Sequence, residues 1–478
     1  MSILCWIRLQ DNLFLSSFFN LYNKEEKRKM ENNKLTKGNV GTSLIKFAIP
    51  FMLANLLQIL YGATDLFVVG HFATTGDVSA VSIGSQIMAT ITYTIVGLTT
   101  GVTVLLGQYT GAKEEKNMVK TLGNAISLFF ILAVIITIPL VLSKNFIVSV
   151  MNTPVAALTA TKHYLAICLS GTIFITGYNV VSSVLRALGD SKTPLLFVAI
   201  ACVINIVLDF VLIKFAKLGA MGAAIATVSA QGISFLFAIY YLYKRGLGFS
   251  FSKKYIKFER FFITKIIKIG FPIALQQALV SASFLLITVV INKMGLVASA
   301  SVGVVEKLIE FLMLPPIAMG SAVSVMVAQN IGAKKLDRAK KSMWLGIAFS
   351  LSVSIIVSIY CWFNGETLTV FFTKDKEVIK AAALYLKTYA IDCVMVSFIF
   401  NLNGYFSGSN HSMFTMVHSL ITTFGLRIPL TILFSQNERA SLTLIGCAAP
   451  LSTLGSIIIC LIYLNYVNKK NNNEILKN

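Results

Sequence analysis

Long runs of apolar residues alternate with short polar segments along nearly the whole chain. A helix needs about 20 apolar residues to cross the hydrocarbon core of a bilayer. Because backbone groups in lipid must bond within the protein, spanning segments are helices or strands of a closed barrel, and runs this continuous lack the alternation of barrel strands. The pattern predicts an all-α polytopic membrane protein with spans near residues 44–70, 79–107, 119–143, 160–184, 194–214, 219–243, 264–293, 299–330, 338–363, 382–405, 413–434 and 443–467.

The composition agrees with that prediction. The 478 residues are 56% hydrophobic and 13% charged, whereas a soluble domain is about 25% charged. Seven cysteines are scattered along the chain without a CxxC or a metal-binding spacing, so we interpret them as small buried apolar side chains. We expect no cofactor and no metal centre beyond a transported cation.

The net charge of +21 is concentrated in alternate loops. Most of the 41 lysines and arginines fall in the segments that are cytoplasmic if both chain ends are cytoplasmic, and cytoplasmic loops carry such an excess. Nucleic-acid binding is therefore not needed to explain the charge. We expect both termini inside the cell.

The first 29 residues differ from the rest of the chain, because Arg8 and Asp11 interrupt their apolar patch and they contain no small-residue cleavage site. The polar stretch from Met30 leads naturally into the first span. We expect residues 1–29 to be a non-native or disordered extension and Met30 to be the initiator, with an interfacial helix as the alternative.

The chain repeats itself. IKFAIP at residues 45–50 recurs as IKIGFP at 267–272, and GQYTGAKEEKNMVK at 107–120 recurs as AQNIGAKKLDRAKK at 328–341. Each half therefore carries six spans in the same orientation. Parallel repeats of this kind are a transporter architecture with the substrate site at the repeat interface. We expect two pseudo-symmetric six-helix lobes around a central cleft, namely residues 30–243 and 264–478 (the second with a short polar tail), joined by a basic cytoplasmic linker at 244–263.

Acidic side chains interrupt the apolar runs at bilayer depth, where charge is costly and is usually kept for function. Asp65 and Asp209 each lie about 5 residues from the outer end of a predicted span, Asn205 is one turn below Asp209, and Thr227 reaches a similar depth. Four oxygen-bearing side chains at one level can hold a hard cation or a proton. The structural alternative is that they cap helix ends or bond to neighbouring spans.

Charge balance favours the first half as the coupling site. Its spans contain Asp65 and Asp209 but no lysine or arginine at that depth, so both carboxyls cannot stay ionised without a proton or a bound cation. The second half contains Glu306, Glu310 and Asp392 but also Lys307 and Arg427. Lys307 and Glu310 have the i,i+3 spacing of a helical ion pair. These groups form either a structural network or, through Glu306, an attraction for cationic compounds.

The order of motifs resembles the multidrug and toxic compound extrusion (MATE) family. Both halves open with a proline-containing span and carry Q-x-x-G-A-K after the second span; further matching stretches are ATDLFVVG, AVSIGSQI, LRALGDSKTP, INIVLDFVLI, GAMGAAIAT and GLRIPL. The resemblance extends from Leu44 to Tyr466. It implies secondary-active, cation-coupled efflux of amphipathic and often cationic compounds.

The resemblance also implies site residues. The family's cation site matches Asp65, Asn205, Asp209 and Thr227, and its flexible proline in the first span matches Pro50. Some members use acids on spans seven and ten, whereas this chain has Gln276 and Gln277 on span seven, and Asp392 lies about a turn from the expected position. That departure argues against a second sodium site. The candidates for the substrate cleft are Gln276, Gln277, Glu306, Glu310 and Arg427.

We therefore expect a monomeric multidrug antiporter in a bacterial inner (plasma) membrane, with H⁺ or Na⁺ as coupling ion and amphipathic drugs or toxins and the lipid bilayer as partners. A flippase for lipid-linked saccharides is the alternative, although its pyrophosphate cargo would need a cationic cavity. An embedded enzyme or an ATP-driven pump is disfavoured because HExxH, DDxxD and P-loop motifs are absent from the sequence.

Overall fold

The computed structural model describes residues 35–151, 153–247, 249, 251–436 and 441–477; the expected extension at residues 1–29 lies outside this part of the chain. Within the described residues, eleven helices are long and apolar enough to cross a membrane, or twelve if one bent pair counts as a single span. Each coincides with one of the predicted spans. The prediction of an all-helical membrane protein is confirmed.

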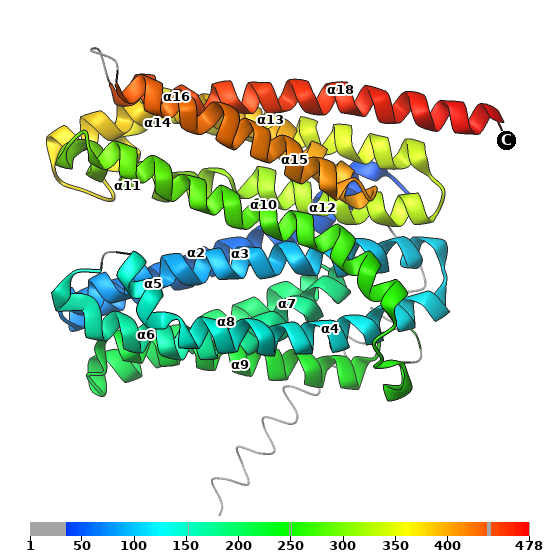
Figure 1. Ribbon diagram of the computed structural model, residues 1–478, viewed down its shortest axis with the longest axis horizontal. Coiled ribbons are helices and arrows are strands. Elements are labelled where there is room, and N and C mark those ends of the chain that lie inside the picture. The colour runs from blue at the N-terminus through cyan, green and yellow to red at the C-terminus, as the bar shows by residue number, and fades with distance from the viewer. Residues whose placement is uncertain (1–34, 152, 248, 250, 437–440, 478) are drawn as a thin grey trace, which may run out of the picture.

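The helices lie roughly along the long axis of the molecule in two groups (Figure 1). The first lobe comprises α2 (Val40–Phe72), α3 (Thr75–Ala112), α4 (Glu115–Leu142), α5 (Lys144–Val150), η1 (Val155–Ala157), α6 (Leu158–Ser170), α7 (Thr172–Ala187), α8 (Lys192–Asp209), η2 (Phe210–Phe215) and α9 (Gly219–Arg245). After η3 (Lys253–Tyr255), the second lobe comprises α10 (Arg260–Asn292), α11 (Leu296–Leu312), α12 (Leu314–Gly332), α13 (Leu336–Thr369), α14 (Lys376–Gly408), α15 (Ser412–Thr422), η4 (Thr423–Arg427), α16 (Ile428–Ser435), α17 (Leu442–Gly446) and α18 (Ala448–Lys477).

Several predicted single helices are irregular. The fourth span bends by 41° between Ser170 and Thr172. The expected helix at 299–330 is divided at Met313, where two prolines occupy the first turn of α12. Proline suits a helix start because the first N–H groups have no helical partner. The fifth and eleventh spans each contain a short π-helix, η2 and η4.

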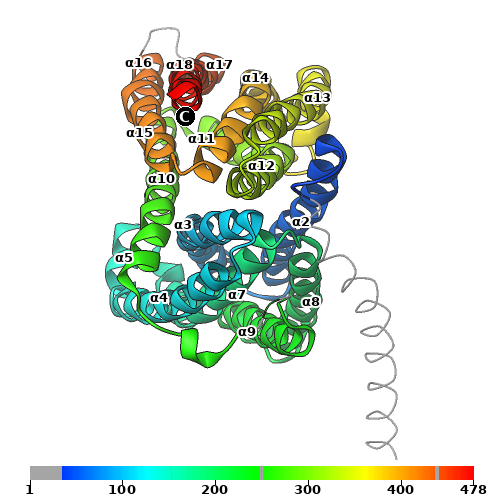
Figure 2. The ribbon, with the colours of Figure 1, turned by 90° about the vertical axis from the view of Figure 1, so that its right-hand side faces the viewer.

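The first helix of each repeat contacts both lobes. The first part of α2, with Phe47 and Ala48, is buried in a core formed by α12, α13 and α14, whereas Ala54 and Val68 are buried in cores of the first lobe. Helix α10 does the reverse, because Ile266 is buried among α3, α4 and α7 while its later residues pack within the second lobe. Figure 2 shows α2 and α10 on opposite sides of the molecule, between the two groups of helices.

The lobes also meet where α3 and α12 end, at the repeated Q-x-x-G motif. Gln108 Nε2 donates to the carbonyl of Gly408 at 3.0 Å, and Gln329 Nε2 donates to the carbonyl of Ala187 at 2.7 Å. Gly408 and Ala187 end α14 and α7, which are equivalent helices of the two repeats. The motif thus makes the same contact twice, once from each lobe. The distribution of basic loops predicts that this end of the molecule faces the cytoplasm.

Candidate cation site

The four polar residues predicted in the first lobe come together in the structure. Thr227 Oγ1 on α9 donates to Asp65 Oδ2 on α2 at 2.9 Å, and Asn205 Nδ2 on α8 donates to Thr227 Oγ1 at 3.5 Å. Asp65, Asn205 and Asp209 are all buried, with at most 4% of each residue exposed. Three helices therefore deliver these side chains to one point.

The cluster has more acceptors than donors. The carboxyl groups of Asp65 and Asp209 are close enough to interact, but neither oxygen of Asp209 accepts a hydrogen bond from a described residue. Asp65 Oδ1 and Asn205 Oδ1 are likewise without a donor among the described residues. None of the ion pairs among the described residues involves Asp65 or Asp209. Buried oxygens left in this way are satisfied by a proton, a cation or a water molecule, and two adjacent carboxyls without a basic partner favour the proton or the cation.

The local backbone places Asp209 at a break in helical geometry. Asn205 and Asp209 share one face of α8, one turn apart, and Asp209 is its last α-helical residue before the π-helix η2. π-Helical turns are uncommon and often mark functional sites. The sequence predicted the two side chains but not the change of helix type.

A second contact between α2 and α9 lies one turn below the first and was not predicted. Gln231 Nε2 donates to Tyr61 Oη at 3.0 Å. Because Tyr61 precedes Asp65 by four residues and Gln231 follows Thr227 by four, the two hydrogen bonds lie one above the other on the facing helices. The i,i+4 spacing on both predicted spans was the available signal.

The groups predicted for the substrate cleft are less closely grouped. Lys307 Nζ and Glu310 Oε1 form the expected i,i+3 ion pair at 3.1 Å, with about half of each side chain exposed. Arg427 Nη2 instead donates to Tyr389 Oη, and its guanidinium lies 4.3 Å from the centre of the Phe284 ring. The expected network therefore divides into an exposed ion pair and a separately bonded arginine. Glu306, Gln276 and Gln277 are half-buried on α11 and α10.

The second lobe has its own buried carboxyl. Asp392 on α14 is 4% exposed, and its Oδ1 accepts a hydrogen bond from Thr453 Oγ1 at 2.6 Å. It resembles Asp65 in burial and in its threonine partner. Unlike Asp65, it has no second carboxyl acting on it among the described residues, and the charged group that it interacts with is Arg427.

Pro50 lies inside α2, which is one continuous helix from Val40 to Phe72. A proline in a helix interior removes one backbone hydrogen bond and weakens the helix locally. It lies between the part of α2 that contacts the second lobe and the part that contacts the first. Bending at this position stays a proposal.

The start of α8 and the end of α9 are held together by a buried ion pair. Arg245 Nη1 lies 2.8 Å from Asp190 Oδ2, with side chains only 8% and 12% exposed. Asp190 Oδ1 also accepts from the backbone N–H groups of Lys192 and Thr193 at the start of α8. The pair thus fixes the two helices that carry Asn205, Asp209 and Thr227.

We expect Arg245→Ala to destabilise the first lobe. Removing one partner of a buried ion pair leaves an uncompensated charge and costs about 3 kcal/mol. The melting temperature of the purified protein in detergent should fall clearly below that of Lys244→Ala, which removes an exposed neighbouring charge. Equal melting temperatures for the two variants would show that the pair contributes nothing to stability.

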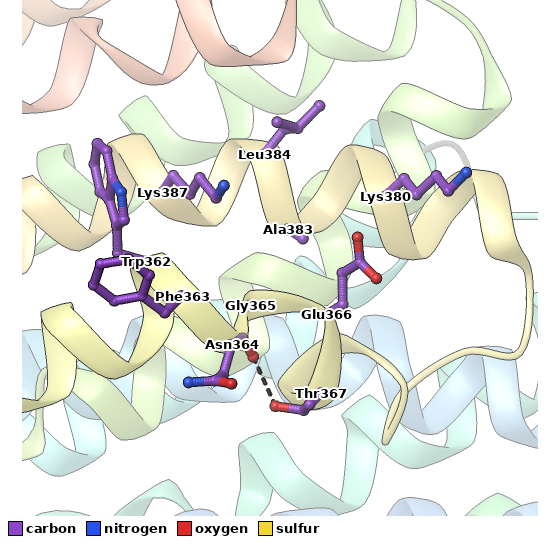
Figure 3. A pocket seen from close by; sticks show the side chains of 10 residues that line it. All are labelled: Trp362, Phe363, Asn364, Gly365, Glu366, Thr367, Lys380, Ala383, Leu384 and Lys387. Carbon is purple, nitrogen blue, oxygen red and sulfur yellow. Dashed lines mark hydrogen bonds between the residues drawn. The ribbon is translucent and has the colours of Figure 1, made fainter.

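A separate pocket of about 440 Å³ lies between α13 and α14 in the second lobe. Figure 3 shows Trp362 and Glu366 on α13, with Lys380 and Lys387 on α14. The backbone of α13 is non-helical at Asn364. This pocket belongs to the other lobe from the Asp65 cluster and shares none of its residues.

Among the described residues, no group of three or more His, Cys, Asp and Glu side chains is placed to hold a metal ion. A cation at the Asp65 cluster would therefore depend on amide and hydroxyl oxygens as well as on the two carboxyls. Oxygen atoms alone are the usual ligands of hard cations.

Comparison with known proteins places the chain among transporters. The MatE family model matches residues 50–211 and 272–433. The chain is 30% identical to the "Probable multidrug resistance protein YpnP" of Bacillus subtilis, over 90% of this chain and 96% of the relative. It is 27% identical to the "Probable multidrug resistance protein YoeA" of the same species, over 91% and 96%.

Solved structures share the fold. The outward-facing conformation of a multidrug resistance MATE family transporter of the MOP superfamily superposes with a TM-score of 0.84 and 20% identity, covering 90% of this chain and 96% of that chain. A MOP superfamily transporter from Pyrococcus furiosus superposes with a TM-score of 0.85 and 19% identity, covering 92% and 97%. The two MatE matches coincide with the two repeats seen in the sequence.

Proposed function

Because the chain belongs to the MatE family of multi-pass membrane transporters, which are not enzymes, we propose that it is a secondary-active multidrug efflux antiporter. It moves amphipathic, often cationic compounds out of the cell against an inward flow of H⁺ or Na⁺. The observation that carries the proposal is the buried pair of Asp65 and Asp209, in which three carboxyl oxygens accept no hydrogen bond from the described residues.

In this proposal Asp65, Asn205, Asp209 and Thr227 form the coupling site. A proton shared by the two carboxyls, or a sodium ion bound by the free oxygens of Asp65, Asn205 and Asp209, would satisfy groups that are costly to leave unpaired in lipid. Both ions suit this set of ligands. Thr227 holds Asp65 and Asn205 in place through its hydroxyl.

Coupling requires that ion and drug favour different conformations of the two lobes, because a ligand shifts an equilibrium only through its differential affinity. The ion would stabilise one arrangement of α2, α8 and α9, and α2 would bend near Pro50 between states. The drug would bind at the repeat interface, where Gln276, Gln277, Glu306, Glu310 and Arg427 are our candidates in the second lobe.

The names of the relatives support drugs as the cargo, since both Bacillus proteins are described as probable multidrug resistance proteins. The environment of Arg427 argues against the flippase alternative. Its guanidinium bonds to Tyr389 and lies over the Phe284 ring. The other cation of this region, Lys307, pairs with Glu310, so Arg427 and Lys307 do not form the cationic cavity that a pyrophosphate needs. We further propose a monomer in a bacterial cell membrane with both termini in the cytoplasm.

The test is ethidium efflux from proteoliposomes under an inward sodium gradient, an inward proton gradient, or neither. We expect one of the gradients to accelerate efflux and thereby to identify the coupling ion. Absence of gradient-driven transport by well-folded protein would contradict the antiporter. Lipid-linked saccharides would then be assayed in the same vesicles.

A further inference from the structure

The segment that precedes α2 is bound by the opposite lobe. We call residues 35–38 the strap; every one of its backbone carbonyls accepts a hydrogen bond from the second lobe. Arg338 donates to the carbonyls of Leu35, Lys37 and Gly38 at 3.2, 2.7 and 2.6 Å, Lys335 donates to that of Thr36 at 2.8 Å, and Asn330 donates to that of Leu35 at 3.2 Å. Hydrogen bonds from charged donors are stronger than neutral ones.

The first two residues of the strap, Leu35 and Thr36, are buried as well as bonded. Leu35 is 4% exposed and belongs to the same core as residues of α12, α13, α14 and α18. Val40, Leu44, Phe47 and Ala48 of α2 continue into that core. A segment that shares a close-packed core moves with it.

The outer part of the same helix belongs to the first lobe. Val68 is fully buried against α3, α6 and α9, and Asp65 is bonded to Thr227. Pro50 lies between these two regions of contact. Helix α2 therefore carries Asp65, one of the two carboxyls of the candidate cation site, near one end and is fixed to the other lobe at its other end.

The second repeat shows the same exchange. Glu259, just before α10, pairs with Lys120 of the first lobe at 3.0 Å, and its backbone N–H donates to Asn124 Oδ1 at 2.5 Å. Here the covalent linker also holds the segment near the first lobe. The strap itself is bonded by the side chains of Asn330, Lys335 and Arg338.

We propose that Asn330, Lys335 and Arg338 are positioning residues for ion–drug coupling, which keep the cytoplasmic end of α2 attached to the second lobe throughout the transport cycle. A rearrangement at Asp65 then changes the angle between the lobes, because α2 connects them. Without the attachment, α2 would follow the first lobe alone. The inference rests on the proposed antiport function.

Two pairs of spin labels test the attachment directly. Labels at Lys46→Cys and Lys341→Cys report the distance between α2 and α13. Labels at Lys116→Cys and Lys341→Cys report the distance between the two lobes. All three lysines are exposed. Distances are measured in nanodiscs at low and high pH, with and without Na⁺ and ethidium, in a background with Cys5 and Cys447 replaced by serine.

We expect the Lys116–Lys341 distance to change between conditions while the Lys46–Lys341 distance stays constant. If both distances change together, the strap detaches and the inference is overturned. If neither distance changes under any condition, the alternating movement of the lobes is contradicted, and with it the proposed function itself.

The second experiment is the ratio of ions to ethidium moved by Arg338→Gln. We expect a ratio at least about tenfold above that of wild type, because ion binding at Asp65 would no longer be linked to the movement of the second lobe that transports ethidium; coupling factors of this size are common. Lys340→Gln, which removes a nearby charge of the same helix, should keep the wild-type ratio, and Arg338→Lys should restore part of the coupling. A lower rate with an unchanged ratio would make Arg338 merely structural and would overturn the inference. If Arg338→Gln does not fold, Lys335→Gln, which loses one bond to the strap, is measured in the same way.

Discussion

Asp65→Asn is expected to abolish gradient-driven ethidium efflux, with a loss of about 100-fold, at the upper end of typical coupling effects. The substitution keeps the shape of the side chain and an oxygen that can accept the hydrogen bond from Thr227. It removes the negative charge that binds a sodium ion and the carboxyl that binds a proton. The folded protein should therefore persist while coupling is lost, as shown by efflux in proteoliposomes and by melting temperature.

Asp392→Asn is the matched control. Asp392 has the same exposed fraction as Asp65, 4%, and a threonine partner, but it lies in the other lobe. We expect this variant to retain coupled efflux. Loss of coupling in Asp392→Asn together with its retention in Asp65→Asn would move the coupling site to the second lobe and contradict the assignment.

Gly111→Ala is expected to separate the lobes at their cytoplasmic contact. A Cβ atom at Gly111 would lie 1.9 Å from the backbone oxygen of Gln329, which cannot move without its helix. The hydrogen bonds of Gln108 and Gln329 to the opposite lobe would lengthen as α3 and α12 move apart. Overpacking of this kind costs about 1–3 kcal/mol, so the melting temperature should fall and closure at the cytoplasmic end should weaken.

Two further glycine substitutions calibrate this prediction. Gly332→Ala should act like Gly111→Ala, because its Cβ would lie 1.9 Å from the oxygen of Gln108 in the equivalent contact. Gly70→Ala should be harmless, since nothing lies within 4 Å of its Cβ position. If Gly111→Ala and Gly70→Ala have the same melting temperature and the same distance between labels at Lys116→Cys and Lys341→Cys, the α3–α12 contact does not hold the lobes together at this end.

Hydropathy and repeats predicted the parts of the structure that depend on local pattern. The spans follow from apolar run length, and depth along three helices places Asp65, Asn205, Asp209 and Thr227 at one level. Even so, depth gives only a level in the membrane. That α2, α8 and α9 are neighbours came from the resemblance to a known family and not from the spacing.

The remaining features depend on contacts between distant segments. The π-helix after Asp209 has no counterpart in the hydropathy pattern, which reads the same in an α-helix and across a short π-helical turn. The exchange of α2 and α10 between the lobes joins residues about 300 positions apart, such as Leu35 and Arg338. The repeated Q-x-x-G motif was visible in the sequence, but only the structure gives its role as a contact made once from each lobe.

The most direct test of the coupling site is the reverse experiment, in which an ethidium gradient drives the ion. Binding energies are reciprocal, so a drug gradient across an antiporter must move H⁺ or Na⁺ in the opposite direction. Proteoliposomes with an imposed ethidium gradient and an internal pH or sodium indicator report this movement. We predict ion flux with wild type and none with Asp65→Asn or Asp209→Asn; ethidium transport without ion flux in wild type, or undiminished flux in both variants, would contradict the account.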